Sequence, residues 1–138
     1  MYKRQLVRRV CVECRVKVEA SEEMQQKISA FIDSLPERVV RPKPEELQLF
    51  EVKSEGEKMG CEKCNFTGYK GRVGIFELLR IDSEMEKFIT DKVGAVDIQE
   101  LAIKQGMVTL QQDGVLRVLT GQTTFSEVEA AAGKIQGF

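Results

Sequence analysis

The four cysteines of this chain stand in two pairs of identical spacing, and they constrain its fold more than any other feature. The pairs are Cys11-Val12-Glu13-Cys14 and Cys61-Glu62-Lys63-Cys64, and the 138-residue sequence contains no histidine. Both sulfurs of a Cys-x-x-Cys pair can reach one ion, and two pairs supply the four thiolates of a tetrahedral structural zinc site. Residues 15–60 separate the pairs, a longer interval than in compact zinc ribbons. A metal would therefore join two distant parts of the chain.

Other interpretations of the cysteines stay open at this point. They could be reduced thiols without a ligand, or a redox dithiol, although a thioredoxin-like dithiol usually has one pair at a helix N-terminus after a strand. A chaperone-type Cys-x-x-Cys-x-Gly-x-Gly motif requires glycine where Phe66 stands, together with repeats that this sequence lacks. Four thiolates accept iron as well as zinc. The prediction carried forward is a Zn²⁺ site formed by Cys11, Cys14, Cys61 and Cys64.

Composition indicates a globular protein with a near-neutral charge. The hydrophobic fraction is 42% and the formal net charge is −1, so bulk charge favours neither nucleic acid nor membrane as a partner. Residues 1–12 depart from this balance, with four basic residues and no acid: Lys3, Arg4, Arg8 and Arg9. They predict either a solvated strand or a segment that leans on another part of a protein.

No apolar run approaches the roughly 18–20 residues that span a bilayer, and residues 1–12 lack the apolar centre of a signal peptide. We therefore expect a cytoplasmic protein without direct membrane insertion. Its thiols would stay reduced, which favours a metal over disulfides.

The first half of the sequence predicts short strands around one helix. The strands are expected at residues 5–12, 47–52 and 72–80. Nothing precedes the first of them to pair with it, so the chain is expected to be the tail of something longer. Ser21 is a suitable N-cap for a helix that Pro36 ends, and the prolines of residues 36–46 predict an exposed connector.

The C-terminal third predicts four short helices, each with a start signal and most with a glycine stop. The starts and stops are Ser83/Glu86 to Gly94, Asp97/Glu100 to Gly106, Thr109/Gln112 to Gly121, and Thr124/Glu127 to Gly133. Helices this short are unstable alone, so we expect them to pack as one small bundle against the preceding strand. The predicted fold class is α+β, mostly α: a zinc-clamped two-knuckle subdomain with short strands, followed by this bundle.

The sequence offers no catalytic set. Without histidine, nucleophiles activated by histidine are excluded. The glycines at 68, 71 and 74 do not match the phosphate-loop pattern Gly-x4-Gly-Lys-Ser/Thr, and they precede a predicted strand rather than a helix. A closed four-thiolate site leaves no position for a reactive water. We therefore expect no catalytic residue and no cofactor site apart from the metal.

Four stretches of the chain resemble type II secretion and type IV pilus assembly ATPases. They are residues 6–14, 60–79, 102–114 and 119–128. The first, Leu-Val-Arg-Arg-Val-Cys-Val-Glu-Cys, is similar to the Leu-Val-Arg-Arg-Leu-Cys-x-x-Cys start of that family's cysteine subdomain. The second resembles the family's second cysteine pair and the Gly-Tyr-x-Gly-Arg-x-Gly-Ile-x-Glu run after it. The resemblance covers roughly residues 6–130 and is most specific at both cysteine pairs. The long spacer resembles the pilus-extension branch, whereas retraction ATPases are expected to lack the cysteines.

This resemblance implies a hexameric cytoplasmic ATPase that drives pilin or pseudopilin assembly and lies at the inner membrane through its partners. In that family a RecA-like core binds ATP and Mg²⁺, and the zinc-binding cysteine subdomain follows it. The Walker A, Walker B, Asp-box and His-box motifs belong to that core and are missing from this sequence. Only Cys11, Cys14, Cys61 and Cys64 carry over as functional residues, so the chain alone is expected not to hydrolyse ATP.

The same resemblance implies an N-terminally truncated chain in three parts. Residues 1–10 would be the end of the ATPase core, residues 11–80 a tetracysteine zinc-binding subdomain with a helical insert, and residues 81–138 a C-terminal helical subdomain. Its expected partners are its own ATPase core, neighbouring subunits, and inner-membrane platform or assembly proteins, with no nucleic acid. The alternative is a free-standing zinc-binding module that interacts with another protein.

Overall fold

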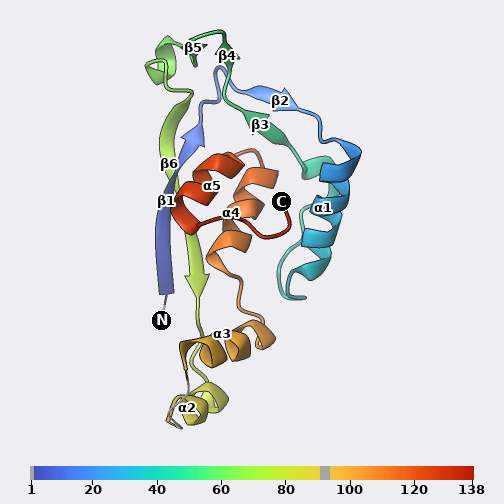
Figure 1. Cartoon of the computed structure of the whole chain (residues 1–138), viewed down its shortest axis with the longest axis vertical. Coiled ribbons are helices and arrows are strands. Elements are labelled where there is room, and N and C mark those ends of the chain that lie inside the picture. Colours follow the sequence, from blue (N-terminus) through green and yellow to red (C-terminus); the bar gives the residue numbers. More distant parts are fainter. Residues whose placement is uncertain (1, 91–93) are drawn as a thin grey trace.

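A long antiparallel ribbon forms one side of the molecule (Figure 1). The computed structural model describes residues 2–90 and 94–138. In it, β1 (Tyr2–Val10) pairs with β6 (Tyr69–Leu78), and the register places Val7 opposite Val73 and shifts between Arg8 and Val10. The predicted strand at residues 5–12 is therefore paired after all, because its partner follows it in the chain instead of preceding it.

The ribbon buries one of its two faces. Val7 and Ile75 are almost fully buried, whereas Leu6 and Leu78 are exposed, as expected when successive side chains of a strand point to opposite faces. The helix α4 (Leu110–Leu119) packs against β6, and α5 (Phe125–Ala132) packs against β1. The ribbon thus supports the C-terminal helices from one side.

The chain between the two ribbon strands forms small elements. They are β2 (Val16–Val18), α1 (Glu22–Ser34), the 3₁₀ turn η1 (Pro44–Glu46), β3 (Leu49–Glu51), β4 (Ser54–Glu55), β5 (Lys58–Met59) and the 3₁₀ turn η2 (Glu62–Cys64). β2 pairs with β3, and β4 pairs with β5 as a short hairpin. The Ser21 hydroxyl accepts a hydrogen bond from the N–H of Met24 at 3.2 Å, which confirms the predicted start of α1. Within the two described ranges, no helix has the length and apolar character needed to cross a membrane.

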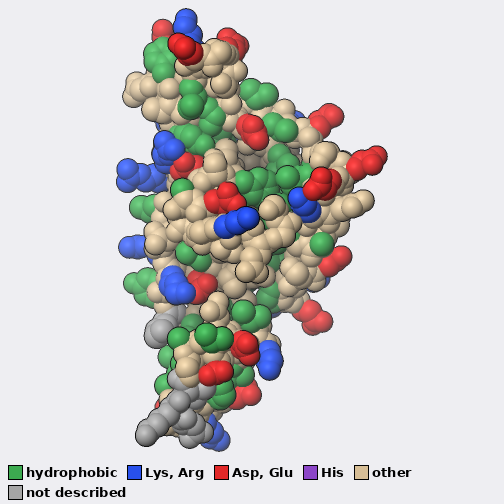
Figure 2. Space-filling model, in the orientation of Figure 1, with side chains coloured by type: hydrophobic (Ala, Val, Ile, Leu, Met, Phe, Trp, Pro, Cys, Tyr) green, Lys and Arg blue, Asp and Glu red, His purple; other side chains and the backbone are tan. Residues whose placement is uncertain are grey.

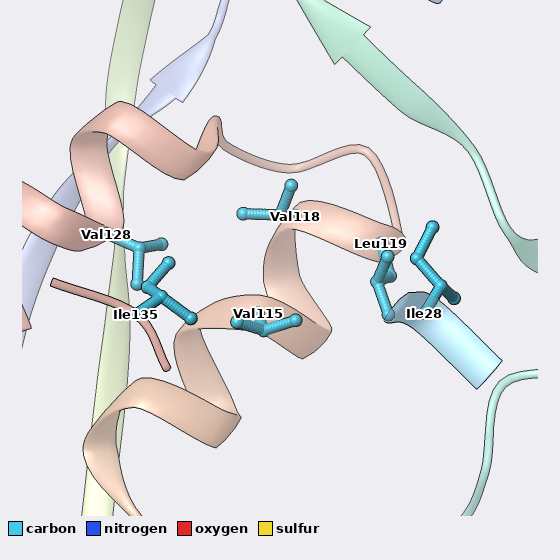
Figure 3. Packing of buried hydrophobic residues seen from close by; sticks show 6 residues of the cluster. All are labelled: Ile28, Val115, Val118, Leu119, Val128 and Ile135. Atoms are coloured by element: carbon cyan, nitrogen blue, oxygen red, sulfur yellow. The ribbon is translucent and has the colours of Figure 1, made fainter. Parts of the chain in front are cut away.

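The main core lies between α1, α4 and α5 (Figure 3). Its buried members are Ile28, Val115, Val118, Leu119, Val128 and Ile135. A glycine lets the last two helices approach closely: a Cβ on Gly114 of α4 would lie 2.4 Å from Cγ1 of Val128 in α5. The predicted helical insert, α1, is therefore packed into the same core as the C-terminal helices.

The four predicted C-terminal helices are present, but they form two pairs rather than one bundle. α2 (Ser83–Thr90) and α3 (Ala95–Lys104) make a hairpin beyond the end of the ribbon (Figure 1). This hairpin has its own small core of Met85, Ala102 and Met107. Residues 107–109, which belong to no helix or strand, connect it to α4. The apolar sides of α2 and α3 cover each other, and Leu79, directly after β6, packs against the same small core.

Two of the predicted helix starts are displaced. Asp82, not Ser83, caps α2, because its carboxylate accepts the N–H of Met85 at 3.0 Å. α3 begins after Gly94, and the Asp97 carboxylate accepts the Gly94 N–H at 3.0 Å. Gly94 therefore caps the start of α3. The predicted stretch between Thr90 of α2 and Gly94 includes residues 91–93, which lie outside the described residues.

Lys and Arg side chains are spaced along the side of the molecule where the ribbon runs (Figure 2). Two of the four basic residues near the N-terminus are paired within the chain. Lys3 contacts the Glu77 carboxylate at 2.8 Å, and Arg8 contacts Glu127 of α5 at 2.5 Å. The basic strand β1 thus contacts α5 of the same chain.

Candidate metal centre

The two cysteine pairs meet at one end of the ribbon. Cys11 directly follows β1, and its N–H donates to the carbonyl of Gly68, just before β6, at 2.9 Å. Pairing of β1 with β6 therefore carries the first cysteine pair to the loop that holds the second. The Sγ atoms of the four predicted ligands, Cys11, Cys14, Cys61 and Cys64, all lie within 4.8 Å of one another.

The spacing of the sulfurs fits one bound ion. The Sγ atom of Cys64 lies 3.9 Å from that of Cys14 and 3.9 Å from that of Cys61. A disulfide would bring two sulfurs to about 2.05 Å. Four thiolates about 2.3 Å from a tetrahedral zinc lie about 3.8 Å from one another. The four free cysteines are thus close enough to hold a metal ion.

Glycines shape the loop around the second pair. Gly60 and Gly68 have φ angles of +69° and +76°, which side chains rarely adopt. A Cβ on Gly60 would lie 2.7 Å from the Cys64 Sγ, and one on Gly68 would lie 2.0 Å from Cγ1 of Val52. These two glycines allow the backbone to approach the Cys64 sulfur and the neighbouring chain.

Two backbone N–H groups point at the sulfur of Cys64. They belong to Cys61, at 3.2 Å, and Gly68, at 3.3 Å. Chiefly through the Cys61 N–H, such bonds lower the pKa of the Cys64 thiol to about 6. Burial instead raises the pKa of Cys14 to about 12. A metal cation at the centre would supply the positive charge that keeps all four sulfurs deprotonated.

Arg15, directly after the first cysteine pair, connects the cysteine cluster to the rest of the fold. The Arg15 guanidinium lies 3.8 Å from the centroid of the Phe50 ring in β3 and donates to the carbonyl of Gly121 at 3.0 Å. No local sequence pattern identifies Arg15, because its partners Phe50 and Gly121 lie far from it in the chain.

A second connection of this kind starts from the ribbon. The Arg8 guanidinium lies 4.2 Å from the centroid of the Tyr69 ring, and the Tyr69 hydroxyl lies 3.0 Å from the Thr124 Oγ1. The Thr123 hydroxyl also donates to the carbonyl of Arg8 at 2.7 Å. The strands that end at the centre are thereby held against the start of α5.

The cluster brings together four thiol groups that could hold one metal ion. In the part of the chain that the structure describes, it is the one group of three or more Cys, Asp or Glu side chains close enough to hold a metal ion. Soft thiolates bind metals such as zinc well, and four of them leave no coordination position for a substrate or water. A metal held there would fix two chain segments to each other, the one just after β1 and the one just before β6.

A comparison with known protein families finds a match over most of the chain. The family model described as "Type II/IV secretion system protein" matches residues 1–130. The chain belongs to this family. The match to the family model confirms, at the level of the family, the resemblance seen in the sequence.

Relatives from both branches of the family are similar to the chain. The type IV pilus assembly ATPase PilB of Thermus thermophilus is 39% identical over 132 residues, which are 91% of this chain and 12% of that protein. The type II secretion system protein E of Aeromonas hydrophila is 34% identical over 124 residues, 89% of this chain and 21% of that protein. The protein E of Dickeya dadantii is 44% identical over 69 residues, 50% of this chain and 14% of that protein. The chain thus spans about an eighth to a fifth of the length of these relatives.

Proposed function

We propose that the chain is the C-terminal, metal-clamped part of a hexameric ATPase that powers pilin or pseudopilin assembly. The family match over residues 1–130 carries this proposal. ATP and Mg²⁺ would bind in a RecA-like core outside this sequence, because residues 1–138 contain no Gly-x4-Gly-Lys-Ser/Thr motif. The long spacer of residues 15–60 favours the pilus-extension branch over the secretion branch.

The metal we propose is Zn²⁺, held by Cys11, Cys14, Cys61 and Cys64. The mutual proximity of the four sulfurs and the soft character of thiolate ligands support this choice. Zinc would supply charge neutralisation and a fixed tetrahedral geometry. Binding contributes roughly 10–16 kcal/mol in small zinc modules, which is comparable to the whole stability of a domain.

The role we propose for the chain is that of a rigid appendage on the motor. Residues 1–10 would join the ATPase core, residues 11–80 would form the zinc-binding subdomain, and residues 81–138 the C-terminal helical subdomain. α1 packs on α4 and α5 across the boundary at residue 80, so the two subdomains would move together. Motion of the hexamer would pass through this unit. Neighbouring subunits and inner-membrane platform or assembly proteins would dock on it, on the cytoplasmic side.

The metal is tested by elemental mass spectrometry of the purified chain, together with a count of reactive thiols. We expect about one zinc per chain, with the thiols protected until a chelator is added. Cys→Ser at each of the four positions should lower metal content and the temperature of thermal unfolding. A folded, metal-free protein with four reactive thiols, or variants with unchanged unfolding, would contradict the clamp.

The assignment to a longer ATPase is tested by the DNA upstream of the coding sequence. We expect a reading frame in the same direction that encodes a phosphate-loop motif. Its absence would instead support a free-standing zinc module that binds another protein.

A further inference from the structure

We propose that Cys61 is the modification site of the second cysteine pair. It would be the thiolate of the second pair that an electrophile alkylates first, opening the coordination sphere while Cys64 stays anchored. This inference rests on the proposed occupancy of the centre by a metal.

The two cysteines of the second pair have different surroundings. Cys64 is buried, and its Sγ accepts the N–H groups of Cys61 and Gly68 at 3.2 and 3.3 Å. Cys61 is only half-buried. The Cys61 Sγ lies 3.9 Å from the Sγ of Cys64.

Burial and the two hydrogen bonds both make the Cys64 sulfur less reactive toward an electrophile. A hydrogen bond to a metal-bound thiolate draws charge from the sulfur and fixes its position, which slows attack on an electrophile. Burial keeps the reagent away from the sulfur. Cys64 has both kinds of protection, whereas Cys61 is only half-buried.

The neighbouring residues add to this contrast. Met59, Glu62 and Lys63 are exposed, so the chain around Cys61 opens to solvent. Gly68, whose N–H donates to the Cys64 sulfur, is buried and packs against Val52. The half-buried Cys61 is therefore open to a reagent, whereas the buried Cys64 sulfur lies against backbone.

The reaction is a simple substitution. With iodoacetamide, the Cys61 sulfur attacks the CH₂ carbon, a C–S bond forms, and iodide leaves with the electron pair of the C–I bond. The product is an uncharged thioether, a much weaker ligand than a thiolate. The metal would then keep three thiolates, and its release should follow modification of Cys61.

The test is timed alkylation of the whole, zinc-loaded chain with substoichiometric iodoacetamide. Peptide mass spectrometry gives the extent of modification at each cysteine, and a zinc-sensitive dye measures release. We expect Cys61 to react at least about tenfold faster than Cys64, the low end of the usual effect of lost outer-shell partners. Zinc release should follow modification of Cys61. Equal rates, a faster Cys64, or release that precedes modification of Cys61 would overturn the proposal.

A pair of variants from the same loop gives an independent check. Cys61→Ser should retain a weakened three-thiolate site that binds Co²⁺ with a visible thiolate band, whereas Cys64→Ser should lose the band. Equal loss in both would count against the inference. If Cys64→Ser does not fold, the alkylation rates of the unmodified sequence still decide. A chain that takes up no zinc at all would overturn the proposed function as well, whereas a zinc-loaded chain with equal rates would overturn this inference alone.

Discussion

Substituting Gly60 with alanine gives a direct test of how the loop shapes the metal centre. Gly60 and Gly56 both have left-handed backbones, with φ of +69° and +61°. At Gly56 a Cβ would have no heavy atom within 4 Å, whereas at Gly60 it would lie 2.5 Å from the Gly68 nitrogen and 2.7 Å from the Cys64 Sγ. Gly56→Ala is therefore a matched control for Gly60→Ala, since it has the same backbone strain without the contact.

The expected losses of stability and of metal affinity follow from these distances. Forcing alanine into the left-handed region costs about 1–2 kcal/mol at either position. Two contacts below 3 Å add about 1–3 kcal/mol at Gly60, as in other overpacked sites. Gly56→Ala should thus lower the free energy of unfolding by about 1–2 kcal/mol, and Gly60→Ala by about 2–5 kcal/mol. Because the Cys64 sulfur must move to relieve the second contact, metal affinity should also fall by about 10- to 100-fold in Gly60→Ala only.

The assay combines urea unfolding at fixed excess zinc with a competition titration against a chromophoric chelator. Co²⁺ can replace zinc as a spectroscopic probe of the thiolate geometry. If both variants lose the same stability and keep the same metal affinity, the close approach of Gly60 to Cys64 does not matter and the reasoning is wrong.

Two further predictions concern the packing of α5. In Gly114→Ala the added Cβ would lie 2.4 Å from Val128 Cγ1, and this clash should lower the free energy of unfolding by about 1–3 kcal/mol. The higher helix propensity of alanine should offset about 1 kcal/mol of that loss. Combining Gly114→Ala with Val128→Ala, which removes that atom, should cost less than the sum of the two changes in urea unfolding; additive effects would contradict the clash. The hydrogen bond from Arg8 holds the pKa of Glu127 below its usual range, so this carboxylate stabilises the fold above about pH 4.3 and loses that effect as pH falls through the lowered pKa. Glu127→Gln should therefore cost about 1 kcal/mol at pH 7, a modest value because Arg8 is 54% exposed, and the difference should vanish in unfolding measured at lower pH.

Local signals in the sequence were sufficient where the partners of a residue are its near neighbours. Thr109 and Gln112 form the predicted capping box of α4: the Thr109 hydroxyl accepts the Gln112 N–H at 3.2 Å, and the Gln112 side chain accepts the Thr109 N–H at 3.0 Å. The spacing within each cysteine pair was similarly sufficient to predict that the four sulfurs would meet. The capping box lies within four consecutive residues, whereas the four sulfurs meet only because β1 pairs with β6.

The same type of signal failed where distant contacts compete for the side chain. Thr124 and Glu127 have capping-box spacing, but the Thr124 side chain makes no cap. Its hydroxyl lies 3.0 Å from both the Tyr69 hydroxyl and Ser126 Oγ, and Glu127 accepts hydrogen bonds from Arg8. Arg8 is 119 residues away in the chain, so the start of α5 shows tertiary contacts overriding a local pattern.

The glycines at intervals of three show how one sequence pattern can have several causes. Gly68 packs on Val52 and donates its N–H to Cys64. Gly74 makes room for the Phe76 ring, which would lie 2.8 Å from a Cβ at that position. Gly71 has a φ of +79°, and a Cβ there would meet only the Cδ of Arg9, at 4.0 Å. The sequence predicted tight turns for all three, and only the structure separates the one that supports the metal centre.

The ribbon and the metal centre depend on each other. A two-stranded ribbon is marginally stable in water unless something covers a face or fixes an end. Here α4 and α5 cover one face of β1 and β6, and the cysteine cluster joins the chain just after β1 to the loop just before β6. The bond from the Cys11 N–H to the Gly68 carbonyl continues the pairing into the cluster, so a slip in register would also separate the sulfurs. A metal that holds the sulfurs together therefore fixes the register of the ribbon, and with it the position of the helices that pack on it.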